Sequence, residues 1–116
     1  PPAVEATTAT GPEFSPNAFL SIGADDTITV TVNKTEMGQG IRTGFAMLVA
    51  EELEADWTKV KVVNATANQA KYGFQGTGGS GSSRSAWETF RRAGAAARVM
   101  LAQAAAKTWG VPESEC

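Results

Sequence analysis

The 116-residue sequence contains no histidine, and its single cysteine is the last residue, Cys116. Zinc sites are built largely from histidine and cysteine side chains, and the common serine and cysteine nucleophiles need a histidine partner. An intrachain disulfide needs a second cysteine. These three kinds of site are therefore excluded, and we predict neither a metal ligand nor a catalytic residue in this chain.

An excess of charge and a long apolar run are also lacking. Ten basic and 12 acidic residues give a formal net charge of −2 at pH 7, which argues against a general binder of nucleic acid or membrane surfaces. No apolar run approaches the roughly 20 residues of a membrane-spanning helix. An anionic ligand would have to be held by local hydrogen-bond donors, and we expect no nucleic-acid partner.

The sequence opens without methionine on a low-complexity stretch, PPAVEATTAT. We predict a disordered or extended lead over residues 1–16 and one partial domain over residues 17–116, because 42% apolar composition is typical of a globular chain. Such a start fits an exported protein after signal removal, and equally a tether or a cloning boundary. A periplasmic or membrane-associated location is favoured over a cytoplasmic one.

The apolar pattern predicts an α+β domain with the element order ββαβα. Residues 18–22 and 27–32 alternate apolar and polar around a turn-forming Gly-Ala-Asp-Asp, which predicts a β-hairpin. Helical spacing predicts a helix over about residues 40–53. Alternating valines at 60–63 predict a strand that is reached from the hairpin by this helical crossover.

A long C-terminal helix is predicted over about residues 81–108, ended by a glycine and a proline. The small residues from Gly94 to Ala97 would let it lie close on a sheet. Before it, residues 66–79 have no periodicity, and a loop of that length is typical of a functional loop. The apolar stripe of the helix is predicted to contain Trp87, Phe90, Gly94, Ala97, Leu101 and Ala104.

Two glycine-bearing segments stand directly before the two predicted helices. The first glycine segment is Thr35–Gly40 (TEMGQG), and the second glycine segment is Gln75–Ser83 (QGTGGSGSS). Backbone N–H groups and hydroxyls that converge at a helix N-terminus bind phosphate well. Dense glycine also costs conformational entropy on folding, which favours a binding role over a mere connection.

Plainer interpretations of both segments stay open. The second glycine segment could be a flexible linker or a helix cap, and its GxGxxG pattern is a weak match because no strand immediately precedes it. Gly38–Gly40 could be a strand-to-helix turn. Glu36 is interpreted as a solvated charge, because no second carboxylate or histidine accompanies it. Lys71 and Arg84 flank the second glycine segment and are typical of surface charges.

One combination of motifs resembles a known family. In this order and spacing, it consists of EMGQG, a helix ending in AEEL, the strand VKVV, and QGTGGS before an Arg/Ala-rich helix. The resemblance is to the molybdenum-binding subunit of the xanthine dehydrogenase and aldehyde oxidase family, most closely its isoquinoline 1-oxidoreductase beta-subunit branch. The resemblance spans residues 16–116 and implies a molybdopterin cytosine dinucleotide cofactor. By this resemblance, Gly38, Gln39 and Gly40 lie near the pterin, and the pyrophosphate is bound by Gly76, Thr77, Gly78, Gly79, Ser80, Gly81, Ser82 and Ser83.

The same resemblance implies oxidation of an N-heterocycle or an aldehyde, with oxygen taken from water and electrons passed to an iron–sulfur partner subunit. Iron–sulfur clusters would belong only to that partner, and a cytochrome is a further candidate partner. The glutamate base of the family lies in a segment that has no match here, and Glu36 does not correspond to it. We therefore expect an N-terminal piece of the large subunit, inactive without the remainder. A stand-alone phosphate- or nucleotide-binding module and a purely structural domain are the alternatives.

Overall fold

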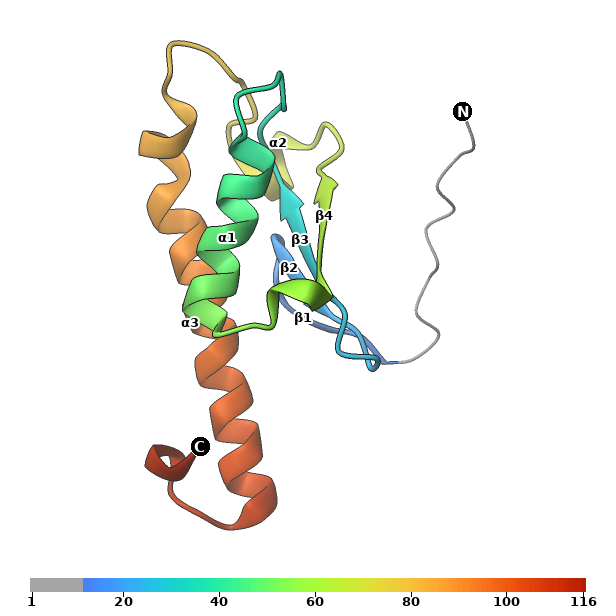
Figure 1. The fold of residues 1–116 in the computed structure, drawn as a ribbon, viewed down its shortest axis with the longest axis vertical. Helices are drawn as coiled ribbons and strands as arrows, with labels where there is room; N and C mark the ends of the chain where they lie inside the picture. Colours follow the sequence, from blue (N-terminus) through green and yellow to red (C-terminus); the bar gives the residue numbers. More distant parts are fainter. Residues whose placement is uncertain (1–11) are drawn as a thin grey trace.

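The computed structural model describes residues 12–116 and contains a four-stranded sheet with two long helices packed on it (Figure 1). The strands lie in their sequence order, with the first three antiparallel and the fourth parallel to the third. They are β1 (Phe14–Asn17), β2 (Leu20–Ile22), β3 (Ile28–Val32) and β4 (Val60–Asn64).

The helices connect and cover this sheet. Helix α1 (Ile41–Leu53) forms the crossover from β3 to β4, which follows a short 3-10 turn, η1 (Trp57–Lys59). A one-turn helix, α2 (Gln69–Tyr72), comes next, followed by the long α3 (Ser82–Trp109) and the 3-10 turn η2 (Glu113–Glu115). The predicted α+β class is confirmed, and the predicted ββαβα elements are all present.

The predicted hairpin is formed by β2 and β3. Leu20 lies opposite Val30, and the turn is closed by the N–H of Gly23, which donates to the carbonyl oxygen of Thr27 at 2.9 Å. Alternation along β3 buries Ile28, Val30 and Val32 beneath the helices and leaves the two threonines between them half-buried. One face of the sheet therefore supplies the core, as the period-two pattern requires.

The core lies where α1 and α3 meet over β3. Phe45 of α1 stacks on Phe90 of α3, with ring centroids 4.3 Å apart, and both side chains are fully buried. Gly94 lies against α1, because a methyl group there would be only 2.6 Å from the carbonyl oxygen of Val49. The small residues of α3 thus admit a neighbouring helix, whereas the sequence analysis assigned them to contact with the sheet.

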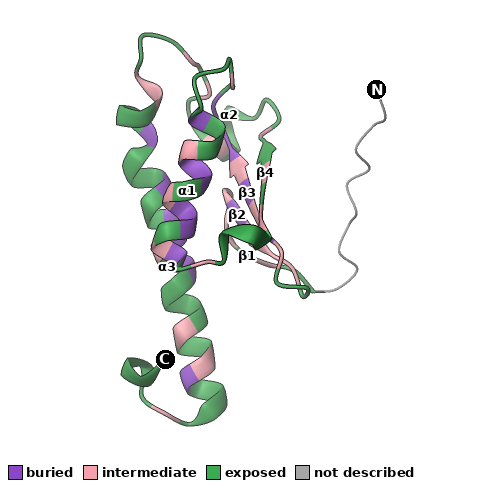
Figure 2. Cartoon of the chain, viewed as in Figure 1, coloured by how far each residue is buried: buried purple, intermediate pink, exposed green. Residues whose placement is uncertain are grey.

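The predicted stripe of α3 is only partly correct. Phe90, Gly94 and Ala97 are buried, but Trp87 and Leu101 are 50% and 41% exposed, and Ala104 is exposed. The second half of α3 extends past α1 and the sheet, so little covers it (Figure 2). The buried positions of the helix are Ala86, Phe90, Ala93, Gly94, Ala97 and Ala106.

One short strand and one short α-helix were not predicted. Strand β1 pairs Phe14 with Ile22 across an irregular register, so the end of the predicted disordered or extended lead is an extended strand of the sheet. Helix α2 interrupts the stretch 66–79, and its first turn is capped by the Asn68 side chain, which accepts from the N–H of Lys71 at 3.0 Å. Of the predicted lead, residues 1–11 lie outside the described residues.

Candidate functional site

Both glycine segments lie at the same end of the molecule (Figure 1). The first glycine segment joins the carboxyl end of β3 to the N-terminus of α1, and the second leads into the N-terminus of α3. Ligands of sheets with parallel strands bind characteristically at the carboxyl ends of those strands. The fold therefore brings together the two segments that the sequence marks as candidates.

The first glycine segment is organised around the carboxylate of Glu36. Its Oε1 accepts hydrogen bonds from the N–H groups of Gly38 and Gly40, each at 2.9 Å, and its Oε2 accepts from the N–H of Arg42 at 3.0 Å. These bonds, that of Arg42 above all, lower the pKa of Glu36 below its usual range. Glu36 is therefore the anionic cap of α1 and not the freely solvated charge that the sequence analysis assumed.

The side chain of Gln39 is also directed back into its own segment. Its Oε1 accepts from the N–H of Met37 at 2.5 Å, and its Nε2 donates to the carbonyl oxygen of Thr35 at 2.8 Å. Gly40 has φ of 82°, a left-handed conformation that glycine adopts without strain. The first glycine segment is thus a preformed turn whose donors are largely satisfied within the turn itself.

The second glycine segment has the opposite character. In the described part of the chain, the backbone N–H groups of residues 74–80 form no hydrogen bond with another protein group. The N–H groups of residues 82–84 are also free of intrahelical partners, because they form the first turn of α3, which has no side-chain cap. Gly79 and Ser80 have φ of 59° and 51°. The donors that an anion needs are therefore concentrated in this segment.

The two glycine segments are held together by residues that directly follow β3. The N–H of Thr35 donates to the hydroxyl oxygen of Thr77 at 3.0 Å. The ammonium group of Lys34 donates to the carbonyl oxygen of Phe74 at 2.6 Å, and Lys34 is only 4% exposed. Burial lowers the pKa of this ammonium group below its usual range. Lys34 could not be predicted from the sequence, because a lysine at a strand end is usually a surface residue.

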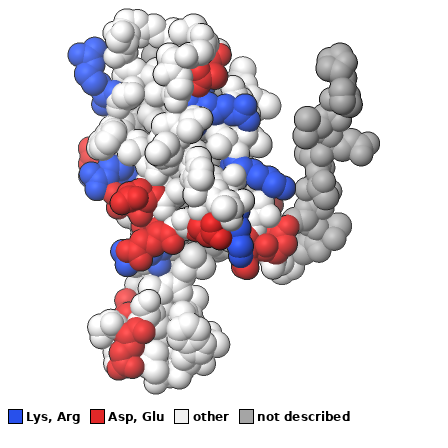
Figure 3. Space-filling view, in the orientation of Figure 1, with Lys and Arg blue, Asp and Glu red and all other residues white. Residues whose placement is uncertain are grey.

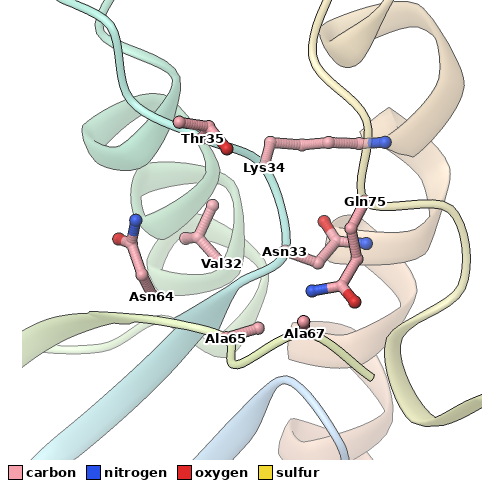
Figure 4. A pocket seen from close by; sticks show the side chains of 8 residues that line it. All are labelled: Val32, Asn33, Lys34, Thr35, Asn64, Ala65, Ala67 and Gln75. Atoms are coloured by element: carbon pink, nitrogen blue, oxygen red, sulfur yellow. The ribbon is translucent and has the colours of Figure 1, made fainter. Parts of the chain in front are cut away.

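A cleft of about 220 Å³ lies beside these contacts, between the ends of β3 and β4 and the chain that follows β4 (Figure 4). The side chain of Gln75 fixes the segment that follows β4. Its Oε1 accepts from the N–H of Asn68 at 2.7 Å, and its Nε2 donates to the carbonyl oxygen of Thr66 at 2.9 Å. Asn33 donates to the carbonyl oxygen of Tyr72 at 2.7 Å. Its own oxygen is enclosed and has no partner among the described residues, so this atom is inaccessible to a ligand in the cleft.

On the face drawn in Figure 3, acidic and basic side chains are interspersed, and few of them lie at the end that carries the glycine segments. Lys71 and Arg84 are both exposed, as expected of surface charges. Any anion held by the second glycine segment would therefore be bound mainly by backbone N–H groups and hydroxyls.

Two structural absences complete the description of residues 12–116. Within them, no group of three or more acidic, histidine or cysteine side chains is arranged to hold a metal ion. In the same residues, no helix is both long enough and apolar enough to cross a membrane.

Comparison with known proteins agrees with this site. The family described as the molybdopterin cofactor-binding domain matches residues 2–116. The chain belongs to this family. The match confirms the resemblance to a molybdenum-binding subunit that EMGQG and QGTGGS indicate.

Two relatives show the same relationship. The chain is 41% identical over 103 residues to a protein of Gluconacetobacter polyoxogenes named membrane-bound aldehyde dehydrogenase [pyrroloquinoline-quinone], with 89% of this chain and 13% of that protein covered. It is 37% identical over 107 residues to the isoquinoline 1-oxidoreductase subunit beta of Brevundimonas diminuta, with 87% and 14% covered. The chain therefore spans about one seventh of the length of these relatives.

Proposed function

We propose that this chain is a cofactor-binding part of a molybdenum-dependent oxidoreductase subunit, and that the second glycine segment binds the phosphates of its molybdopterin cofactor. The observation that carries this proposal is the contrast between the two segments. The donors of the first are consumed by Glu36 and Gln39, whereas the N–H groups of residues 74–80 have no hydrogen-bond partner within residues 12–116. Family membership supplies the identity of the anion.

The residues present fit a dinucleotide form of the cofactor. A pyrophosphate has more oxygens than one N–H group can satisfy, and this segment offers consecutive N–H groups from Gly76 to Gly79 followed by an uncapped helix N-terminus. Hydroxyls add further donors, because each can rotate toward an anion. We assign the pyrophosphate to Gly76, Thr77, Gly78, Gly79, Ser80, Gly81, Ser82 and Ser83.

The first glycine segment has a different proposed role. Gly38, Gln39 and Gly40 are assigned to the neighbourhood of the pterin, where their preformed turn shapes the site. Because the Glu36 carboxylate already occupies the amides at the N-terminus of α1, a second anion there would meet like charge. Phosphate binding by this segment is therefore disfavoured.

When bound, the molybdenum cofactor supplies the redox centre that accepts electrons from the substrate. The residues of this chain hold and orient it. The proposed reaction is oxidation of an aldehyde or an N-heterocycle with water as the oxygen source, consistent with the names of the two relatives. The proposed partners are the remainder of the large subunit, an iron–sulfur subunit and a cytochrome. A periplasmic or membrane-associated location stays a prediction.

The name of one relative contains pyrroloquinoline quinone, a different cofactor. That name describes a protein of which this chain matches only 13%, whereas the family description applies to residues 2–116 of this chain. Molybdopterin is therefore the better-supported ligand of this segment.

The proposal is tested on the full-length subunit, purified with its partners. Molybdenum is measured by elemental analysis, and the organic cofactor released by acid is identified by mass spectrometry. We expect molybdenum together with a pterin and cytidine monophosphate. Pyrroloquinoline quinone without molybdenum would contradict the proposal. An ordinary nucleotide would favour the phosphate-binding module, and the absence of any bound cofactor would favour the structural domain.

The phosphate assignment is tested by Gly79→Ala in the same subunit. A side chain at φ of 59° costs about 1–2 kcal/mol, so the retained molybdenum should fall. Gly44→Ala is the matched control, because Gly44 lies inside α1 and a methyl group there would meet no atom within 4 Å. Equal molybdenum content in both variants would remove the second glycine segment from the site.

A further inference from the structure

The three residues that directly follow β3 contact the chain before α3. Asn33 donates through its side chain to Tyr72, Lys34 to Phe74 and, at 3.4 Å, to Gly76, and the N–H of Thr35 donates to Thr77. Successive residues of one segment thus bind progressively later residues of the other. The end of β3 determines how the beginning of the second glycine segment lies.

Lys34 is the unusual member of this set. A buried ammonium group is costly unless it is paired, and pairing is usually with a carboxylate. Among the described residues, Lys34 forms no salt bridge, and its partners are two backbone carbonyl oxygens and the ring of Phe74, 4.7 Å from the ammonium nitrogen. The charge is therefore directed at the backbone of residues 74–76.

These contacts fix the direction of two peptide units. In a planar trans peptide, the C=O and the following N–H point in opposite directions, and no cis peptide bond occurs in the described chain. Because the carbonyl groups of Phe74 and Gly76 accept from Lys34, the N–H groups of Gln75 and Thr77 must point away from it. These two N–H groups belong to the run that has no hydrogen-bond partner among the described residues.

We propose that Lys34 is a positioning residue for the phosphate-binding segment. It draws the carbonyl groups of Phe74 and Gly76 inward and so turns the N–H groups that follow them, those of Gln75 and Thr77, outward, where the anion is bound. Lys34 acts through the backbone and does not touch the anion. This inference rests on the proposed function, because it assigns a cause to the donor geometry of that same segment.

The test compares Lys34→Met, Lys34→Arg and Lys71→Met in the full-length subunit with its partners. The methionine variant keeps an unbranched apolar side chain and removes the donor, whereas arginine keeps a charged donor. Lys71→Met is the matched control, since Lys71 is an exposed lysine of neighbouring α2 and forms no hydrogen bond through its ammonium group to described residues. Two quantities are measured, namely hydrogen exchange of the bonded amides of Thr35, Gly73 and Gly81 in the cofactor-free subunit and molybdenum retained per subunit in the holoenzyme.

For Lys34→Met we expect exchange of these three hydrogen-bonded amides to accelerate on the order of tenfold, with α1 unchanged, and molybdenum retention to fall. Lys34→Arg should recover part of the slow exchange and part of the molybdenum retention, and Lys71→Met should match the wild type in both quantities. Unchanged exchange in Lys34→Met would overturn the inference. Faster exchange together with full molybdenum retention in Lys34→Met would also overturn it. The same holds if Lys34→Arg loses as much molybdenum as Lys34→Met. A wild-type holoenzyme without molybdenum would instead contradict the proposed function, and the exchange result alone would then decide whether Lys34 holds the segment.

Discussion

The backbone N–H of Thr35 donates to the hydroxyl oxygen of Thr77 at 3.0 Å and joins the two glycine segments across 42 residues of sequence. One segment ends a strand and the other leads toward a helix, so this bond couples the N-terminal regions of α1 and α3. A cofactor that contacts both segments would find them already fixed relative to each other. The site is in this sense organised before binding.

Removing the Thr77 hydroxyl should loosen this coupling. Thr77→Val keeps the shape of the side chain and leaves the N–H of Thr35 without its partner, which costs about 1 kcal/mol. We expect faster hydrogen exchange at the amide of Thr35 and a lower midpoint of thermal unfolding. Thr77→Ser retains the hydroxyl and should behave as the wild type. Identical behaviour of the valine and serine variants would mean that the bond contributes nothing.

The contribution of Glu36 should depend on pH. Hydrogen bonds from Arg42, Gly40 and Gly38 stabilise its ionised form and lower its pKa in the folded state. The stability that it contributes is therefore complete above the unfolded pKa of about 4.3 and is lost as the pH falls through the lower folded value. Wild type should exceed Glu36→Gln in unfolding free energy at neutral pH, and the difference should vanish in acid.

Chemical denaturation at a series of pH values measures this effect. Glu51→Gln is the control, because Glu51 is an exposed glutamate of α1 whose side chain forms no hydrogen bond to the described residues. It should leave the acid dependence of the wild type unaltered. A Glu36→Gln variant with the same acid dependence as the wild type would disprove the capping role.

Substitution of Gln39 should follow an order set by its two hydrogen bonds. Gln39→Glu keeps an acceptor for the N–H of Met37 but places a carboxylate oxygen against the carbonyl oxygen of Thr35. Gln39→Ala removes both bonds without adding repulsion. We expect cofactor retention to be highest in the wild type, lower in the alanine variant and lowest in the glutamate variant. Equal retention in all three would reduce Gln39 to an ordinary turn residue.

Gly94 should be the position of α3 least tolerant of a larger side chain. Gly94→Ala places a methyl group 2.6 Å from the carbonyl oxygen of Val49, so α1 and α3 must move apart. We expect a loss of about 1–3 kcal/mol in unfolding free energy. Gly44 lies inside α1, and a methyl group there would meet no atom within 4 Å. Because alanine favours the helix over glycine, Gly44→Ala should instead stabilise the chain by up to about 1 kcal/mol. Denaturant unfolding of both variants checks the opposite signs.

Much of the fold follows from local patterns in the sequence. The alternation of Ile28, Val30 and Val32 predicts β3 and its buried face, and helical spacing predicts α1 within a residue of its observed start. Strand β1 was missed, because its four residues include a proline and carry little alternation. The exposed end of α3 was misassigned, because an apolar stripe predicts a contact only where another element is present to make it.

The candidate site was predicted in part, for physical reasons that differ between its components. Glycine density marks both segments, because unusual backbone geometry requires glycine there. The role of Glu36 depends on hydrogen bonds within a turn, and a lone carboxylate gives no sign of them. The role of Lys34 depends on its contact with Phe74, which lies 40 residues later in the sequence, and no local pattern indicates such a contact.

The central claim is that the phosphates lie on the second glycine segment while Glu36 keeps the first one closed to anions. An experimental structure of the intact subunit with its cofactor measures this directly. The account predicts pyrophosphate oxygens within hydrogen-bond distance of backbone N–H groups of the second glycine segment, with the Glu36 carboxylate still accepting from Gly38 and Gly40. A phosphate on the N–H groups of Gly38 and Gly40, with Glu36 displaced, would contradict it.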